Sequence, residues 1–164
     1  MAKRNLTGMV TPSVLDRLID EEPKQTAEAP RTAAQSMRDF KGAVRRDLEW
    51  LLNTRRTIEP VPPSARETAR SVYHYGLADL SSKSKLSSKD QADLVRDIES
   101  ALAIFEPRLK RVKVRMEPIE RGSRNLQFVI EGLLSVDPAP EPVRFDTVLE
   151  IGRGEYKVQG ESVA

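Results

Sequence analysis

The spacing of apolar residues changes abruptly at one proline in the second half of the chain. Before it, apolar residues recur three or four positions apart, which predicts an amphipathic helix from Ser88 to about Phe105, with Ser88 as N-cap and Gln91 as its capping-box partner. Pro107 lacks a backbone N–H and restricts the residue before it, so the helix should end there. The stripe of this helix comprises Leu94, Ile98, Leu102 and Phe105, widened by Val95 and Ala101.

After this proline, residues of two kinds alternate, which predicts a strand with one apolar and one cationic face. The expected faces are Lys110, Val112, Val114 and Met116 on one side and Leu109, Arg111, Lys113 and Arg115 on the other. Between helix and strand, Glu106, Pro107 and Arg108 form a rigid corner that holds a carboxylate beside a guanidinium.

The N-terminal region predicts one short helix followed by a linker. Thr11 can cap this helix and Pro12 fits its first position, where a missing N–H costs nothing. The helix should end before Pro23, and it is too short to be stable without docking on another surface. The segment from Pro23 to Ala34 is rich in Pro, Ala, Thr and Glu and has no periodicity, which is typical of a linker.

Two further helices are predicted before the central stretch. The first runs from Ser36 to Asn53, and Trp50 at the edge of its stripe is more typical of a core or rim anchor than of a ligand-stacking residue. The second runs from Ser64 to Tyr75 and ends at Gly76, a residue suited to a helix C-cap. The stripe of the first comprises Phe40, Val44, Leu48, Leu51 and Leu52, and Val72 and Tyr73 are the expected buried positions of the second.

The C-terminal third predicts a meander of antiparallel strands. A hairpin turn is expected from Glu120 to Arg124, and a second strand from about Asn125 to Val136. Gly132 within that strand indicates a bulge or a close backbone approach. A third strand alternates from Val143 to Ile151, and a short last strand runs from Glu155 to Val158.

Helices followed by a meander predict an α+β fold, with N-terminal helices followed by a C-terminal antiparallel sheet of three to four strands packed on the long central helix. We expect residues 1–34 to be an N-terminal docking helix and flexible linker, and residues 35–164 to be one α+β domain. A sheet of this size has at least one open edge, which can accept a strand from another chain.

Composition excludes several classes of function. The chain has 164 residues, no cysteine and one histidine, His74, so disulfides, thiolate catalysis and a histidine- or cysteine-based metal site are not expected. No apolar run reaches the length of a transmembrane helix, and the first nine residues lack the apolar core of a signal peptide. The 27 basic residues almost balance the 25 acidic ones, so bulk charge does not favour nucleic acid.

Three features of the sequence could in principle carry chemistry. Glu99 and Glu106 lie seven residues apart on one helix, but two carboxylates are not enough to mark a hydrolase cleft. No glycine-rich loop precedes a helix in the form that binds phosphates. The cationic strand face could meet nucleic-acid phosphates, but the residues favour a solvated face or pairing with Glu131, because the aromatic residues are too few and not interleaved with the cations.

The Glu-Pro-Arg corner is the least ordinary feature of the sequence. Arginine makes bidentate contacts with carboxylates, so Arg108 can serve either of two purposes. It can tie the end of the helix back to its own domain, or it can contact a partner. The residues alone favour neither reading.

Four segments together resemble a known family. They are Pro12 to Leu18 with Pro23, Val44 to Arg56, Val72 to Leu80, and Phe105 to Leu109 with the strands that follow. The chain resembles the TssE family of small baseplate subunits of the bacterial type VI secretion system, which is similar to a wedge protein in the baseplates of contractile phage tails. His74 and Ala78 depart from the asparagine and proline of the family pattern.

The resemblance implies a non-catalytic protein without cofactors, assembled at the cytoplasmic face of the bacterial inner membrane without inserting into it. Glu106, Pro107 and Arg108 match the family motif implied to engage the core helical bundle of TssF and TssG. The last strands are implied to exchange with the first ring of the TssB–TssC sheath, through Val143, Phe145, Thr147, Leu149, Tyr156 and Val158. TssK and the VgrG spike hub are further implied neighbours, and nucleic acid is not one. The alternative is a lysozyme-like peptidoglycan hydrolase, a label that some relatives carry.

Overall fold

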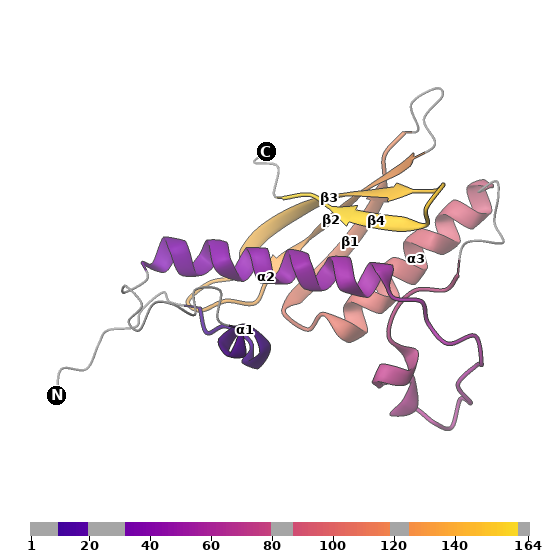
Figure 1. Cartoon of the computed structure of the whole chain (residues 1–164), viewed down its shortest axis with the longest axis horizontal. Helices are drawn as coiled ribbons and strands as arrows, with labels where there is room; N and C mark the ends of the chain where they lie inside the picture. The colour runs from indigo at the N-terminus through magenta and orange to yellow at the C-terminus, as the bar shows by residue number, and fades with distance from the viewer. Residues whose placement is uncertain (1–9, 20–31, 80–86, 119–124, 161–164) are drawn as a thin grey trace.

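The computed structural model describes residues 10–19, 32–79, 87–118 and 125–160, and it arranges them as helices packed on one antiparallel sheet (Figure 1). The helices are α1 (Val14–Leu18), α2 (Ala33–Asn53) and α3 (Ser88–Phe105), with 3₁₀ turns η1 (Thr68–Arg70) and η2 (Val72–His74) between α2 and α3. The strands are β1 (Leu109–Met116), β2 (Asn125–Leu134), β3 (Glu141–Glu150) and β4 (Glu155–Val158), ordered β1-β2-β3-β4 with every neighbour antiparallel. The predicted α+β class is confirmed.

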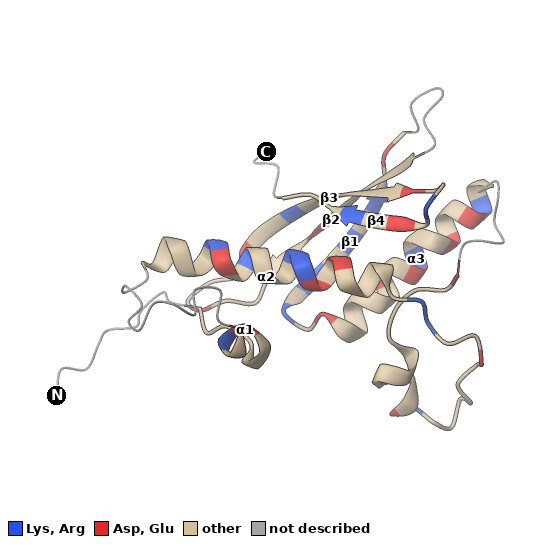
Figure 2. Ribbon diagram, in the orientation of Figure 1, with Lys and Arg blue, Asp and Glu red and all other residues tan. Residues whose placement is uncertain are grey.

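One face of the sheet forms the core with the helices. Phe128 on β2 pairs with Thr147 on β3, which pairs with Val158 on β4, so these side chains share one face. The other face carries ion pairs between Arg115 and Glu131 and between Arg144 and Asp146, and Figure 2 shows basic residues on these strands. The sheet therefore has one apolar and one largely polar face.

Two helices cover the apolar face, rather than the single long helix that the sequence predicts. The apolar stripes of α2 and α3 lie in one buried cluster with the sheet residues. Helix α3 lies against β1, and α2 lies against β4. The sheet thus has a helix beside each of its edge strands. The buried stripe residues are Phe40, Val44, Leu48, Leu51 and Leu52 on α2 and Leu94, Ile98, Ala101 and Leu102 on α3.

A β-bulge interrupts β1 and changes which of its residues face the core. The pairing shifts by one residue between Lys110 and Lys113, and Arg111 lies there with φ of 52°. Leu109 therefore faces the core and is buried, although simple alternation places it on the cationic side. Gly132 lies opposite the bulge, where an added Cβ would approach Leu109 Cδ1 to 2.8 Å. The close approach predicted at this glycine is confirmed.

The helices begin at caps close to the predicted positions. Helix α3 is capped by Ser87, whose hydroxyl accepts from the Asp90 N–H at 3.2 Å, one residue before the expected cap. Helix α1 is capped in the same way by Ser13 with Asp16, two residues after the expected Thr11. In both cases an aspartate three residues after the N-cap serine completes the capping box, and this pair determines where the helix begins.

Residues 54–79 form a lobe outside the sheet, at the lower right of Figure 1. Its base is closed by Arg56 N–H bonding to Leu77 O at 2.8 Å and by Leu77 N–H bonding to Thr54 O at 2.9 Å. Gly76 has φ of 104°, and a Cβ there would lie 2.3 Å from Thr54 O, so only glycine fits.

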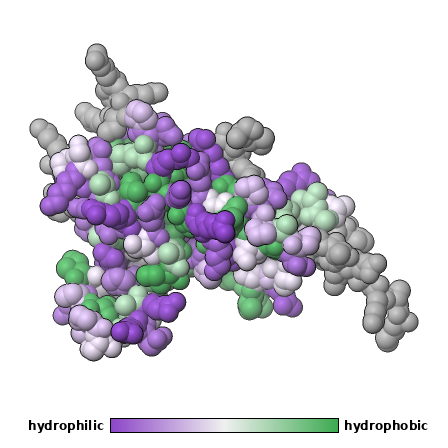
Figure 3. All heavy atoms as spheres, turned by 180° about the vertical axis from the view of Figure 1, so that it is seen from behind, coloured by the Kyte–Doolittle hydropathy of each residue, from purple (hydrophilic) through white to green (hydrophobic). Residues whose placement is uncertain are grey.

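The single helix predicted between Ser64 and Tyr75 is wrong, because this segment forms only the two 3₁₀ turns of the lobe. Val72, expected to be buried, is 88% exposed, and Tyr73 is also exposed. Figure 3, seen from behind, shows apolar residues exposed on this lobe at the lower left. Helical spacing without a core to face therefore did not produce a helix.

The second and third strands end earlier than predicted. Strand β2 ends at Leu134 rather than Val136, and β3 ends at Glu150, which leaves Ile151 exposed in the following turn. The predicted turn at 120–124 and residues 23–31 of the predicted linker lie outside the described residues. The last two linker residues, Ala33 and Ala34, already belong to α2, which begins three residues before the predicted Ser36 because Thr32 and Gln35 form its capping box. No helix in the described part of the chain is long and apolar enough to span a membrane.

Candidate functional site

The corner between α3 and β1 is built by Glu106, the residue that ends α3. Its N–H bonds to Leu102 O at 3.0 Å, and its carbonyl accepts from Leu109 N–H at 3.1 Å, so it closes the helix and opens the strand. Pro107 between them is exposed, whereas Glu106 is only 3% exposed. A carboxylate this deeply buried needs a partner of opposite charge.

Arg108 supplies that partner. Its Nε donates to Glu106 Oε1 at 2.7 Å, its Nη2 donates to Glu106 Oε2, and its backbone N–H donates to Oε1 at 3.2 Å. Nη2 also contacts Asp47 Oδ2 of α2 at 2.7 Å. The corner is therefore locked to α2 by a guanidinium shared between two carboxylates.

A chain of ion pairs continues from this corner to α1. Asp47 Oδ1 accepts from Arg46 Nε at 3.0 Å, and Arg46 Nη2 donates to Asp16 Oδ1 at 2.7 Å. Asp16 also completes the cap of α1 with Ser13. Ser36 Oγ adds a second tie to the N-terminal segment by bonding to the backbone of Val10.

The pKa shifts in this network follow from the pairing. Hydrogen bonding to Glu106 raises the pKa of Arg108 above its usual value despite burial, so this cation stays charged. Burial opposes the ionisation of Asp16, but hydrogen bonds from Ser13 and Arg46 outweigh it and lower the pKa of Asp16. Burial and the nearby charges of Asp47 and Glu106 raise the pKa of Tyr75.

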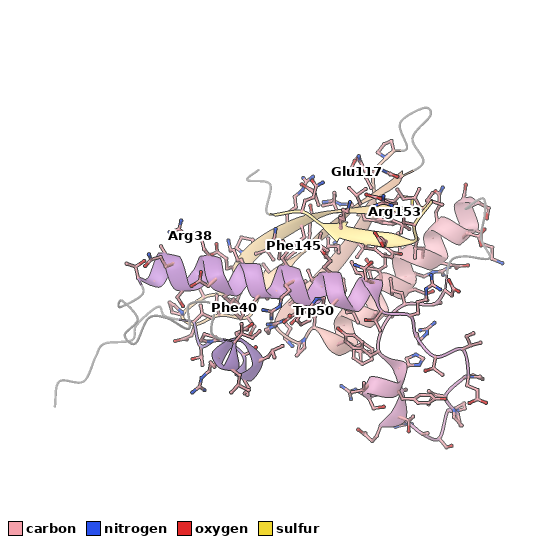
Figure 4. The ribbon with its side chains drawn as sticks, in the orientation of Figure 1. Arg38, Phe40, Trp50, Glu117, Phe145 and Arg153 are labelled. Atoms are coloured by element: carbon pink, nitrogen blue, oxygen red, sulfur yellow. The ribbon has the colours of Figure 1, made fainter. Side chains whose placement is uncertain are left out.

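An open pocket of about 350 Å³ lies beside the corner. Trp50 on its wall is half exposed and lies under the Arg46 guanidinium, 4.8 Å from the ring centre. Tyr75 and Phe105 meet edge to face with ring centres 5.2 Å apart. Figure 4 labels Trp50 in the half of α2 nearer the lobe. The pocket is lined by Ser13, Leu15, Asp47, Trp50, Leu51, Tyr75, Phe105, Glu106, Pro107 and Arg108.

The structure brings together the predicted Glu106, Pro107 and Arg108 with residues that sequence reasoning did not assign to a site. Asp47, Arg46 and Asp16 are distant in sequence, and only the fold places them beside the corner. One feature of the sequence could have indicated Asp47. It directly precedes Leu48, a residue of the predicted apolar stripe that is buried in the structure, so Asp47 had to lie at the edge of the core.

The strand residues predicted to face the sheath all point into the core. Val143 is the most exposed of them at 6%. Their side chains therefore pack against the helices, and a partner can reach these strands through backbone groups at a sheet edge. The residues are Val143, Phe145, Thr147, Leu149, Tyr156 and Val158.

Helix side chains already occupy part of both sheet edges. Asn53 of α2 accepts from Tyr156 N–H and donates to Tyr156 O, both at 2.8 Å, as a neighbouring strand would. Glu49 accepts from Val158 N–H at 3.2 Å. At the opposite edge, Glu99 of α3 accepts from the N–H of a β1 residue, Val114, at 2.9 Å. These contacts protect edges that would otherwise pair with other chains.

The carboxylates considered for hydrolysis therefore have other partners. Glu99 bonds to the β1 edge and Glu106 to Arg108. On the cationic face of β1, Arg115 pairs with Glu131 across the strands, as the cross-strand reading predicts. In the described ranges, no group of three or more His, Asp or Glu residues could hold a metal ion.

One family match identifies the class of protein, a structural subunit of phage-tail-like baseplates. Residues 38–139 match the model of the family described as baseplate wedge protein gp25. The match covers more than half of the 164 residues and includes most of α2, together with α3, the corner, β1 and β2. The chain belongs to this family, and the resemblance to a baseplate subunit is confirmed. A search of curated proteins found no match.

Proposed function

We propose that this chain is a baseplate subunit of a type VI secretion system that links the TssF–TssG wedge to the first ring of the TssB–TssC sheath. The observation that carries the proposal is the baseplate wedge family match over residues 38–139, joined to the TssE-like motifs of the sequence. In this proposal the chain helps to start sheath assembly and performs no catalysis. It acts in the cytoplasm at the inner membrane, near TssK and the VgrG hub.

The Glu-Pro-Arg corner is the proposed contact with the TssF–TssG helical bundle. Three features support this assignment: Pro107 is exposed, the corner is held rigidly by Arg108, and a pocket opens beside it. A rigid, preorganised surface loses less conformational entropy on binding than a mobile one.

The N-terminal segment is the second proposed docking element. It would act separately from the domain that begins with α2, whose start at Ala33 lies two residues before the predicted domain boundary at residue 35. Helix α1 supports this idea, because it buries none of its residues and is held by the Asp16–Arg46 ion pair.

The proposed sheath contact is strand addition at the outer edge of β3. Strand β4 pairs with β3 only from Thr147 to Glu150, and Gln159 N–H extends this pairing to Asp146 O. Within the described chain, β3 continues back to Glu141 without a β4 partner. A sheath strand added there would use backbone hydrogen bonds and would leave the buried side chains in place.

Co-purification with TssF–TssG tests the proposal. The wild-type chain should retain both proteins, and Arg108→Ala should retain less after circular dichroism confirms that the variant is folded. Arg153→Ala is the matched control, because Arg153 is an exposed arginine near the β3–β4 turn. Failure of the wild-type chain to retain TssF–TssG would contradict the proposed function, and equal retention by all three forms would exclude the corner as the contact.

A further inference from the structure

We propose that the pocket beside the corner takes one uncharged apolar side chain from a partner helix, and that Arg108 is a positioning residue that does not itself hold the partner. This inference rests on the proposed function and specifies how that contact is made. It differs from a charge clasp, in which the guanidinium of Arg108 would reach a carboxylate on the partner.

The charged groups around the pocket are already paired with one another, with one carboxylate in excess, so the pocket does not attract a further carboxylate. Asp16, Asp47 and Glu106 supply three carboxylates, and Arg46 and Arg108 supply two guanidinium groups, linked in one chain of contacts. The Nε and Nη2 atoms of Arg108 both donate to carboxylates of this chain. A partner carboxylate that took over the Nε or Nη2 donor would displace one of these contacts, and Glu106, at 3% exposed, could not then be solvated.

The open part of the lining is apolar and aromatic. Trp50 is 50% exposed and Leu15 is 46% exposed, although both are large apolar residues beside a hollow. A hollow of about 350 Å³ is large enough for a leucine, methionine or phenylalanine side chain. Tryptophan at the edge of a pocket is the residue type most enriched where partners anchor.

Helix α1 indicates the shape of the partner segment. It lines the pocket through Ser13 and Leu15, and it exposes Val14 and Leu18 four residues apart on the same short helix. A partner helix with apolar residues three or four apart could insert one side chain and cover α1 with the next. An extended strand would lack this spacing.

The test measures the affinity of the full chain for the purified TssF–TssG complex by titration calorimetry. Trp50→Ala should raise Kd by about tenfold or more, the loss typical of a truncated anchor. Ile58→Ala is the matched control, because Ile58 is 93% exposed and lies outside the pocket, and its Kd should stay within about twofold of wild type.

The same titration at two salt concentrations separates an apolar anchor from a charge clasp. Raising NaCl from about 50 mM to about 500 mM should change Kd by less than about threefold, because screening acts on charge contacts exposed to solvent. A tenfold weakening by salt together with an unchanged Kd for Trp50→Ala would overturn the inference while the proposed function stands. Absence of wild-type binding would contradict both.

A direct signal comes from 5-fluorotryptophan at Trp50, the single tryptophan of the chain. Its fluorine resonance should shift when unlabelled TssF–TssG is added, and it should not shift when the labelled chain alone is concentrated. A shift on concentration would mean that a second copy of the chain fills the pocket, which would also overturn the inference.

Discussion

The corner and the β4 edge use the same turns of α2 in opposite ways. At the corner, Asp47 and Arg46 pair with other side chains, and the hollow beside Trp50 stays open. At the edge, Glu49 and Asn53 bond to the backbone of β4. In the first region the charged side chains pair with one another and apolar surface stays exposed beside them. In the second region the side chains of α2 occupy backbone groups of an edge strand.

This division follows from helical geometry. Successive residues of a helix are turned by about 100°, so Asp47 and Glu49 point about 200° apart, on either side of the buried Leu48. A single helix can therefore hold the corner on one flank of its buried stripe and protect a sheet edge on the other. Polar residues beside a buried stripe can therefore have fixed, separate structural partners.

Removal of Arg108, at the corner, should lower the stability of the protein the most. Arg108→Ala leaves the buried Glu106 without its cation and should lower the free energy of unfolding by about 3 kcal/mol. Urea denaturation measures this loss, and Arg153→Ala should stay within about 0.5 kcal/mol of wild type. An equally small effect of both changes would show that the corner is not held by this pair.

Removal of Asn53 should have a smaller effect, confined to the β4 edge. Asn53→Ala deletes two hydrogen bonds to Tyr156 and should cost about 1–2 kcal/mol. The Tyr156 amide should exchange with solvent faster, and the protein should associate more readily through this edge. Unchanged exchange at Tyr156 would mean that Asn53 does not protect the strand.

Acidification should have the smallest effect, on the tie between α1 and α2. The pKa of Asp16 is lowered below its ordinary value of 3.8 in the folded chain, so its contact with Arg46 stabilises the docked α1 at higher pH. This contribution, about 0.5–1 kcal/mol for a single partly exposed pair, is lost as pH falls through the lowered pKa.

Trp50 fluorescence follows this acid release, because Arg46 lies over the indole ring. The emission should change below pH 3.8 in the wild type. In Asp16→Asn, the emission should already resemble the acid form at neutral pH. Identical pH profiles for the two proteins would show that the Asp16–Arg46 contact does not hold α1.

The sequence predicts helices and strands correctly where the periodic apolar residues form a face that is buried in the core. This holds for the apolar stripes of α2 and α3 and for the alternating residues of β3, because all of them face one continuous core. Prediction fails where a single residue changes the register, as at the bulge around Arg111, or where no core exists, as in the lobe with the exposed Val72.

The candidate site could be predicted only in part. Glu106, Pro107 and Arg108 are adjacent in sequence, so their corner is visible as a motif. Asp47 lies 61 residues from Arg108, and only the packing of α2 beside the corner makes them partners. From the sequence alone, the motif is compatible both with a contact inside the domain and with a contact to a partner. The position of the Asp47 carboxylate, which only the structure gives, shows that Arg108 makes a contact inside the domain.

Hydrogen exchange of the chain, alone and bound to TssF–TssG, shows whether the corner is the baseplate contact. If it is, exchange should become slower on binding from Phe105 to Leu109 and in α1, and β4 should be unchanged because α2 already protects it. Protection at the outer edge of β3 or at β4, with none at the corner, would contradict the assignment of the corner as the baseplate contact.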